Sequence, residues 1–236
     1  MKHRVTLSVI AAVIAVGIYA VIPERHYQTS VYPVSGNVSV SAYDDSSDGG
    51  TSRASMNASD SALDFECTLG GDPAKNAWCG LIWNMDPQGK GKYENWSFMD
   101  SIIMDFDASG TQQVIVKIWT YDPDVTDSRK NITFRQLLKE VPVKEGHNHI
   151  AVPVEEFYVP DFWYDQTGAK RTLTNRHQES VARFEITPGW NTAPHKQFKL
   201  HIVNIQARGV SSAPLGILLG VFIVLAVFAI SGKKGK

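Results

Sequence analysis

Aromatic side chains carry the clearest binding chemistry of this chain, which holds 6 Trp and 8 Tyr among 236 residues. Sugars present apolar C–H faces that stack on such rings, while sugar hydroxyls need polar partners such as carboxylates and guanidinium groups. Lys117, Trp119 and Tyr121 alternate along a predicted strand, so they share one face, and Lys117 indicates that this face is exposed. Loop aromatics and two carboxylates complete the predicted ligand-binding set of Trp119, Tyr121, Asp122, Asp124, Tyr93, Trp96 and Trp163.

The alternative for the Trp side chains is ordinary packing, because most Trp residues of a β-sandwich lie in or beside its core. We expect packing for four of the six Trp. Trp78 and Trp83 lie in the apolar run around Cys79 and are predicted to form a core pair. The others remain candidates for a binding surface.

A cluster of acidic residues, Asp44, Asp45 and Asp48, stands beside Gly49 and Gly50 on a turn-prone segment. Carboxylate oxygens on a tight loop suit Ca²⁺, so this segment is a predicted calcium site. The alternative is a solvated turn in which the Asp side chains accept backbone hydrogen bonds and no metal is needed. Both interpretations stay open at this point.

The two cysteines, Cys67 and Cys79, are separated by twelve residues and fall in neighbouring predicted strands. In an oxidising compartment, such a pair most simply forms a disulfide. A metal site would need two further soft or imidazole ligands, and the His residues are remote in the sequence.

The sequence contains none of the common enzyme motifs, such as Gly-x-Ser-x-Gly, His-Glu-x-x-His or a phosphate-binding loop. His147, His149 and His201 are predicted to decorate strands rather than to bind a metal. A glycosidase would need two carboxylates about 5–9 Å apart across a cleft, and sequence alone places no such pair. We therefore predict a protein without catalytic residues.

Two apolar runs without charge, Val5–Ile22 and Ala213–Ile230, frame the chain. Each run has 18 residues, which as helix is close to the thickness of a bilayer core. We expect residues 213–230 to cross a membrane, followed by a basic cytoplasmic tail over 231–236. Residues 1–22 are either a signal anchor or a cleaved signal peptide, and Ile18 fits poorly as the residue three positions before a cut.

Charge is unevenly distributed although the formal net charge is only −1. Five Lys and Arg lie in the two tips, which leaves 18 basic against 24 acidic residues between positions 23 and 212. The positive-inside rule places both tips in the cytoplasm and the acidic segment on the extracytoplasmic (periplasmic) side of the inner (plasma) membrane. The balance also argues against nucleic-acid binding.

Short alternating or β-branched runs between Gly, Pro, Asp and Asn predict an all-β sandwich over residues 38–208. Residues 23–37 are a stalk or a first strand, and residues 165–178 a long polar loop. Residues 134–140 (FRQLLKE) are predicted as a short helix. The predicted strands are Val38–Ala42, Leu63–Thr68, Trp78–Met85, Met99–Asp107, Gln113–Tyr121, His147–Val154, Val181–Thr187 and Phe198–Ala207.

Several segments carry a family resemblance. AYDDSSDGGTSRA at 42–54, followed by LDF at 63–65 and CGL at 79–81, resembles the opening of galactose-binding-like β-jelly-roll domains, including carbohydrate-binding modules. Segments further along resemble the extracytoplasmic sensor domain of some bacterial membrane diguanylate cyclases and histidine kinases: IWTYDPDV at 118–125, Lys130-Asn131, VPVEEF at 152–157, VARFEI at 181–186 and FKLHIVNI at 198–205. The resemblance covers residues 42–208.

The resemblance implies a galactose-binding-like jelly-roll fold, a structural calcium near Asp44 and a sensor that binds carbohydrate or a similar polar envelope ligand. Proteins of that family usually continue into a cytoplasmic enzyme, whereas this sequence ends at Lys236. We therefore expect a sensor that passes ligand occupancy to a membrane partner, with Gly216-x-x-x-Gly220 as one route to helix association. The competing hypothesis is a structural or assembly component of an envelope complex with no small-molecule ligand.

Overall fold

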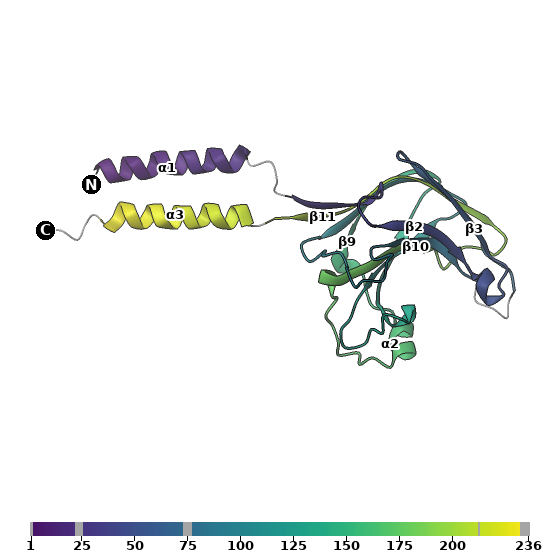
Figure 1. Ribbon diagram of the computed structural model, residues 1–236. Coiled ribbons are helices and arrows are strands. Elements are labelled where there is room, and N and C mark those ends of the chain that lie inside the picture. Colours follow the sequence, from purple (N-terminus) through teal and green to yellow (C-terminus); the bar gives the residue numbers. More distant parts are fainter. Residues whose placement is uncertain (1, 22–25, 73–76, 212, 232–236) are drawn as a thin grey trace. The chain divides into compact units, whose positions relative to one another are not determined.

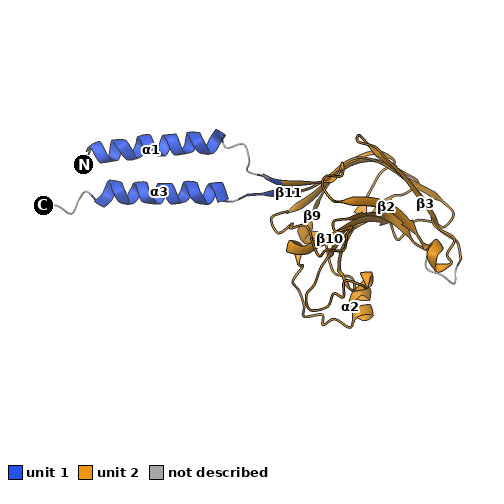
Figure 2. Cartoon of the chain, in the orientation of Figure 1, with its two compact units in different colours: residues 1–27, 209–236 blue, residues 28–208 orange. Residues whose placement is uncertain are grey.

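The computed structural model describes residues 2–21, 26–72, 77–211 and 213–231. The chain divides into two compact units, one formed by residues 1–27 with 209–236 and the other by residues 28–208 (Figure 2). The first unit holds two helices, and the second is a β-sandwich.

The sandwich consists of two sheets, and every strand pair with a defined register is antiparallel. Sheet A has the order β3-β4-β11-β6-β9 with β1 also beside β11, and sheet B has the order β2-β5-β10-β7-β8. Figure 1 shows β3 in one layer and β2 and β10 in the other. The strands of sheet A are β1 (His26–Tyr32), β3 (Arg53–Ala58), β4 (Leu63–Thr68), β6 (Ser101–Ser109), β9 (Gly146–Pro153) and β11 (Gln197–Val210). Those of sheet B are β2 (Ser39–Asp44), β5 (Cys79–Asn84), β7 (Gln113–Thr120), β8 (Arg135–Pro142) and β10 (Val181–Pro188).

The hydrophobic core lies between the two sheets and follows the alternation of the strands. On β6, Ile102, Met104 and Phe106 point inward and are buried, as their period of two requires. Aromatic pairs fill the centre, with Trp83 packed edge-to-face on Phe184 at 5.4 Å between ring centroids. The predicted all-β sandwich is therefore confirmed.

One predicted element is wrong: residues 134–140 do not form a helix. Arg135–Pro142 is the edge strand β8, paired along its whole length with β7. Leu137 and Val141 share the inward face and are fully buried, so strand packing outweighs the helix propensity of a segment too short to be a stable helix.

The two segments predicted as irregular carry structure. The stretch proposed as stalk or first strand contains β1, whereas residues 22–25 lie outside the described residues. The polar loop over 165–178 begins inside the short helix α2 (Asp161–Thr167), which lies on the side of sheet B (Figure 1).

The predicted disulfide is confirmed: Cys67 of β4 is bonded to Cys79 of β5. Because β4 belongs to sheet A and β5 to sheet B, this bond ties the two sheets together. Both cysteines are buried in the core.

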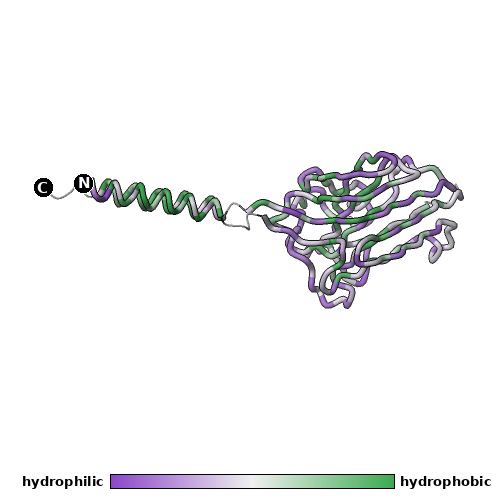
Figure 3. Tube along the Cα trace, turned by 90° about the horizontal axis from the view of Figure 1, so that it is seen from above, coloured by the Kyte–Doolittle hydropathy of each residue, from purple (hydrophilic) through white to green (hydrophobic). Residues whose placement is uncertain are grey.

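The helices α1 (Lys2–Val21) and α3 (Ala213–Ser231) cover the two predicted apolar runs, with nearly the same bounds. Both are long and apolar enough to cross a membrane, and their side chains are not buried against other parts of the chain. Figure 3 colours the helical part mostly as hydrophobic. The guanidinium of Arg4 lies 5.2 Å from the ring centre of Phe228, and Ser8 donates to the carbonyl of Leu225, so the helices run antiparallel.

Candidate functional site

The outward face of sheet B collects the residues with binding chemistry. Alternation turns Lys117 and Trp119 of β7 outward, and the register of the sheet puts Glu185 and Arg183 of β10 directly beside them. Tyr43 of β2 lies on the same face. Sequence reasoning found Trp119 here but missed the two charged residues of β10.

Glu185 is the polar centre of this face and is almost completely buried. Its carboxylate accepts hydrogen bonds from the Lys117 ammonium at 3.0 Å, from the Trp119 indole N–H at 2.6 Å and from the Tyr43 hydroxyl. Burial raises the pKa of Glu185 to about 8 and lowers the pKa of Lys117 to about 8. The three donors favour the ionised carboxylate and fix the orientation of the Trp119 ring.

Gly80 creates the space that lets Tyr43 reach Glu185. A Cβ at position 80 would lie 2.7 Å from the Tyr43 hydroxyl oxygen, closer than side-chain contacts allow. Tyr43 in turn packs on Trp78, with 5.6 Å between ring centroids. Because Gly80 has no side chain, Tyr43 of β2 can extend across β5 to reach Glu185 of β10.

An aromatic groove lies at one end of the same face. Tyr93 and Tyr121 stack with 5.3 Å between their centroids, and Phe134 meets both rings edge-on at 6.2 and 6.3 Å. Arg183 lies over Phe134 at 5.0 Å and over Trp119 at 5.6 Å. These residues other than Trp119 line an open groove of about 680 Å³, which we call the Tyr93–Tyr121 groove.

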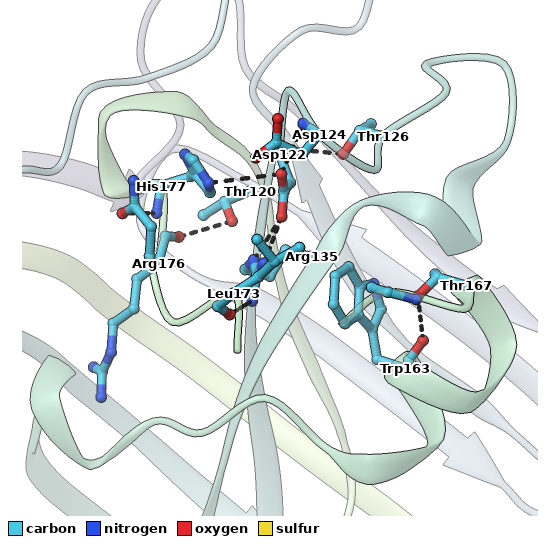
Figure 4. Close-up of polar contacts among 12 residues, drawn as sticks. Thr120, Asp122, Asp124, Thr126, Arg135, Trp163, Thr167, Leu173, Arg176 and His177 are labelled. Carbon is cyan, nitrogen blue, oxygen red and sulfur yellow. Dashed lines mark hydrogen bonds and ion pairs between the residues drawn. The ribbon is translucent and has the colours of Figure 1, made fainter. Parts of the chain in front are cut away.

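A buried ion pair joins the residues that follow two of the groove aromatics in the chain (Figure 4). Arg135 donates from Nε and Nη2 to Asp122 at 3.0 and 2.5 Å, and the guanidinium also lies over the Trp163 ring at 4.7 Å. Both members of the pair are fully buried. Because Tyr121 precedes Asp122 and Phe134 precedes Arg135 in the chain, the pair fixes the backbone that presents two groove aromatics.

The same network holds the polar loop on sheet B. Arg135 donates to the carbonyl of Leu173 at 2.9 Å, and Thr120 donates to the carbonyl of Arg176, also at 2.9 Å. The ring Nε2 of His177 lies 3.6 Å from Asp122. The loop is therefore attached at several points along its length (Figure 4).

Two exposed aromatics occupy the other end of the face. Glu140 of β8 accepts hydrogen bonds from the Trp190 indole at 3.0 Å and from the Tyr158 hydroxyl at 2.7 Å. Trp190 is 64% exposed and Tyr158 is 46% exposed. One carboxylate thus fixes two rings that solvent still reaches.

The structure brings together only part of the predicted ligand-binding set. Trp119, Tyr121 and Tyr93 lie on one face, and Asp124 is exposed in the following turn. Trp96 and Trp163 are fully buried, so these two rings are not available to a ligand. Asp122 is occupied by Arg135, because a buried carboxylate needs a charged partner.

The prediction of a core pair holds for Trp83 and is wrong for Trp78. Trp78 precedes β5 and lies beside Tyr43 with 37% of its surface exposed. The missed residues Arg183 and Glu185 had a visible signal, since they are charged residues alternating with Phe184 and Ile186 in an apolar strand. Phe134 was hidden by the wrong helix assignment.

The acidic cluster predicted to bind calcium forms a hydrogen-bonded turn. Asp45 is buried and accepts three hydrogen bonds: from the Ser52 backbone N–H at 2.8 Å, from the Ser52 hydroxyl at 2.6 Å and from the Trp78 backbone N–H at 3.1 Å. Asp44 accepts from Ser46 and Ala54, and Asp48 is exposed. Within the described ranges, no group of three or more His, Cys, Asp or Glu side chains is arranged to hold a metal. Calcium binding here stays a prediction, which a thermal melt with and without chelator tests.

The outward face of sheet A has a different character. His147 and His149 of β9 are exposed and lie within 4 Å of the carboxylates of Asp105 and Asp107. The ring Nδ1 of His201 lies 2.7 Å from a carboxylate oxygen of Asp64. This face presents charged pairs and no stacked aromatic platform among the residues described, so sheet B is the better candidate for binding.

Comparisons with known proteins agree with the fold. No protein-family model and no curated protein sequence matches the chain, so neither supports the resemblance to cyclase and kinase sensor domains. Two solved family 11 carbohydrate-binding modules of Clostridium thermocellum do match, one in complex with a β-1,3-1,4-mixed-linked tetrasaccharide and one from a cellulosomal cellulase. Each is 12% identical with a TM-score of 0.50 and 79% of this chain covered, and 96% and 95% of the respective module is covered. The likeness confirms the predicted jelly-roll fold.

Proposed function

We propose that the chain binds carbohydrate on the outward face of sheet B, without catalysing a reaction. The observation that carries the proposal is the Tyr93–Tyr121 groove, an open groove in which stacked aromatic rings lie beside the polar side chains of Arg183 and Asn84. Stacking on ring faces combined with a few polar contacts is the general way in which proteins bind sugars.

The solved neighbours support the ligand class. One of them was solved with a bound β-1,3-1,4-mixed-linked tetrasaccharide, and its fold is that of this chain. The groove aromatics were identified here from their own geometry, independently of that likeness. Together the two observations favour a sugar over another polar envelope ligand.

The cellular setting is the second part of the proposal. The two helices are long and apolar enough to span a membrane, and the Lys and Arg residues at both tips favour a cytoplasmic position for both ends. The sandwich then lies outside the inner membrane, where its disulfide is stable. We propose that binding of a ligand in the groove is signalled to a partner protein in the membrane.

A glycan array with the full-length chain in detergent tests the binding, followed by titration of the best oligosaccharide. Tyr121→Ala is expected to weaken that affinity about tenfold or more, because it removes one ring of the stack. Tyr164→Ala on α2 is the matched control, since Tyr164 is outside the groove lining.

Two results would count against the proposal. Equal affinities of Tyr121→Ala and the unaltered chain would indicate that the sugar binds outside the groove. Absence of any glycan hit at millimolar concentration, together with a stable protein partner in a pull-down, would favour the structural or assembly role instead.

A further inference from the structure

Arg183 is a guanidinium without a carboxylate partner in the described part of the chain. Its Nη2 donates to the Asn131 side-chain oxygen at 2.7 Å, and the group is otherwise held between the rings of Phe134 and Trp119. The remaining N–H donors of Arg183 are free to meet a ligand in the Tyr93–Tyr121 groove, which this residue lines. Cation–π contacts orient the guanidinium plane but do not neutralise its charge.

Among the described residues, no carboxylate forms an ion pair with Arg183. Glu185, two residues along the strand, is already bound by Lys117, Trp119 and Tyr43. Asp86 also lines the groove, but its carboxylate accepts from the backbone N–H groups of Lys90 and Gly91. Arg129, the other cation of the lining, is paired with Asp127 at 3.0 Å.

A half-buried cation without an ion-pair partner is unusual on this domain, because the acidic residues of the domain outnumber its basic ones. Between positions 23 and 212, 24 Asp and Glu stand against 18 Lys and Arg. A guanidinium binds a carboxylate through two parallel hydrogen bonds, whereas a neutral hydroxyl takes one. Arg183 therefore offers a site shaped for a planar anion next to a stacking platform.

We propose that the groove selects a sugar that carries a carboxylate, a uronic acid, with the sugar ring on the Tyr93–Tyr121 stack and the carboxylate on Arg183. This inference rests on the proposed carbohydrate-binding function and adds the class of sugar. The tyrosine rings account for affinity toward any pyranose, and Arg183 accounts for the preference among them.

The test compares two ligands that share one sugar backbone, one with ionised carboxylates and one in which they are neutral methyl esters. Tetragalacturonate and its fully methyl-esterified form are titrated into the full-length chain in detergent by calorimetry. The unaltered chain is expected to bind the acid about tenfold more tightly than the ester, the size of one charge-assisted hydrogen bond. Arg183→Gln is expected to lose this preference, because its affinity for the acid falls more than its affinity for the ester.

Arg53→Gln is the matched control, because Arg53 is an exposed arginine of β3 in the opposite sheet. Thermal melts of both variants confirm that they fold. Equal affinities for the acid and the ester, or an equal loss for both ligands in Arg183→Gln, would overturn the inference while leaving carbohydrate binding in place. Absence of binding to both galacturonates and to every glycan of the array would overturn the proposed function as well.

Discussion

At the scale of single residues, Glu185 shows how a sheet surface holds an aromatic ring in place. A carboxylate under the candidate binding face is costly to bury, and its three donors come from two other strands of the sheet, Tyr43 from β2 and Lys117 and Trp119 from β7. Because Trp119 is one of these donors, its ring is oriented before any ligand arrives. Such preorganisation lowers the entropy lost on binding.

Asp45 gives the sharpest prediction for stability. Asp45→Ala is expected to lower the free energy of unfolding by about 2 kcal/mol, because it leaves the buried N–H and hydroxyl donors of Ser52 and the backbone N–H of Trp78 without their acceptor. Urea unfolding at pH 7 measures the loss. Asp48→Ala is the matched control, and an equal loss there would contradict the explanation.

The contribution of Asp45 is expected to disappear in acid. Burial raises the pKa of Asp45, but hydrogen bonds from Ser52 and Trp78 outweigh burial and hold the pKa below its ordinary value. A lowered pKa stabilises the fold above the ordinary aspartate value of about 3.9, and this stabilisation is lost as the pH falls through the lowered value. The difference between Asp45→Ala and the unaltered chain should therefore shrink as the pH is lowered through this range.

The residues of the site could be predicted from the sequence only where the alternation within a single strand is sufficient. Alternation with Lys117 is enough to place Trp119 on an exposed face, and that inference agrees with the structure. The contact between Tyr43 and Glu185 joins residues 142 positions apart, and it depends on the missing side chain of Gly80. Trp96 and Trp163 lie in segments that resemble loops, yet tertiary packing buries both.

At the scale of elements, the strand pattern was readable where burial alternates along the strand, as it does in β4, β6 and β11 of sheet A. Ile102, Met104 and Phe106 of β6 are an example. The edge strand β8 was misassigned because Leu137 and Leu138 are adjacent apolar residues, a spacing that also fits one face of a helix. Leu138 is buried because β8 bridges to Tyr158 on its outer side, a pairing that the sequence does not indicate.

The disulfide provides the prediction at this scale. Replacing both Cys67 and Cys79 with Ser is expected to lower the free energy of unfolding by about 3 kcal/mol, as for a closed loop of this size. Guanidinium unfolding of the chain with and without reductant measures the effect. The double variant should be insensitive to reductant, and an unaltered midpoint of the reduced chain would contradict a stabilising role.

At the scale of the whole molecule, the two helices pack on each other within one compact unit. α1 and α3 run antiparallel, and in the same unit the Ser211 hydroxyl lies 3.3 Å from the Tyr27 hydroxyl. A reporter fusion tests the proposed topology: alkaline phosphatase inserted at residue 150 is expected to be active, and the same enzyme fused after Lys236 to be inactive. The reverse pattern would place the sandwich in the cytoplasm.

The meeting of β1 and β11 has a practical meaning for protein engineering. β1 and β11 pair with each other, and residues 28–208, which contain most of both strands, form a compact unit that could be exchanged as a whole. Another sandwich of the same fold, joined to residues 27 and 209, would leave α1 and α3 unchanged. The scaffold could then display a different recognition surface on an unchanged anchor.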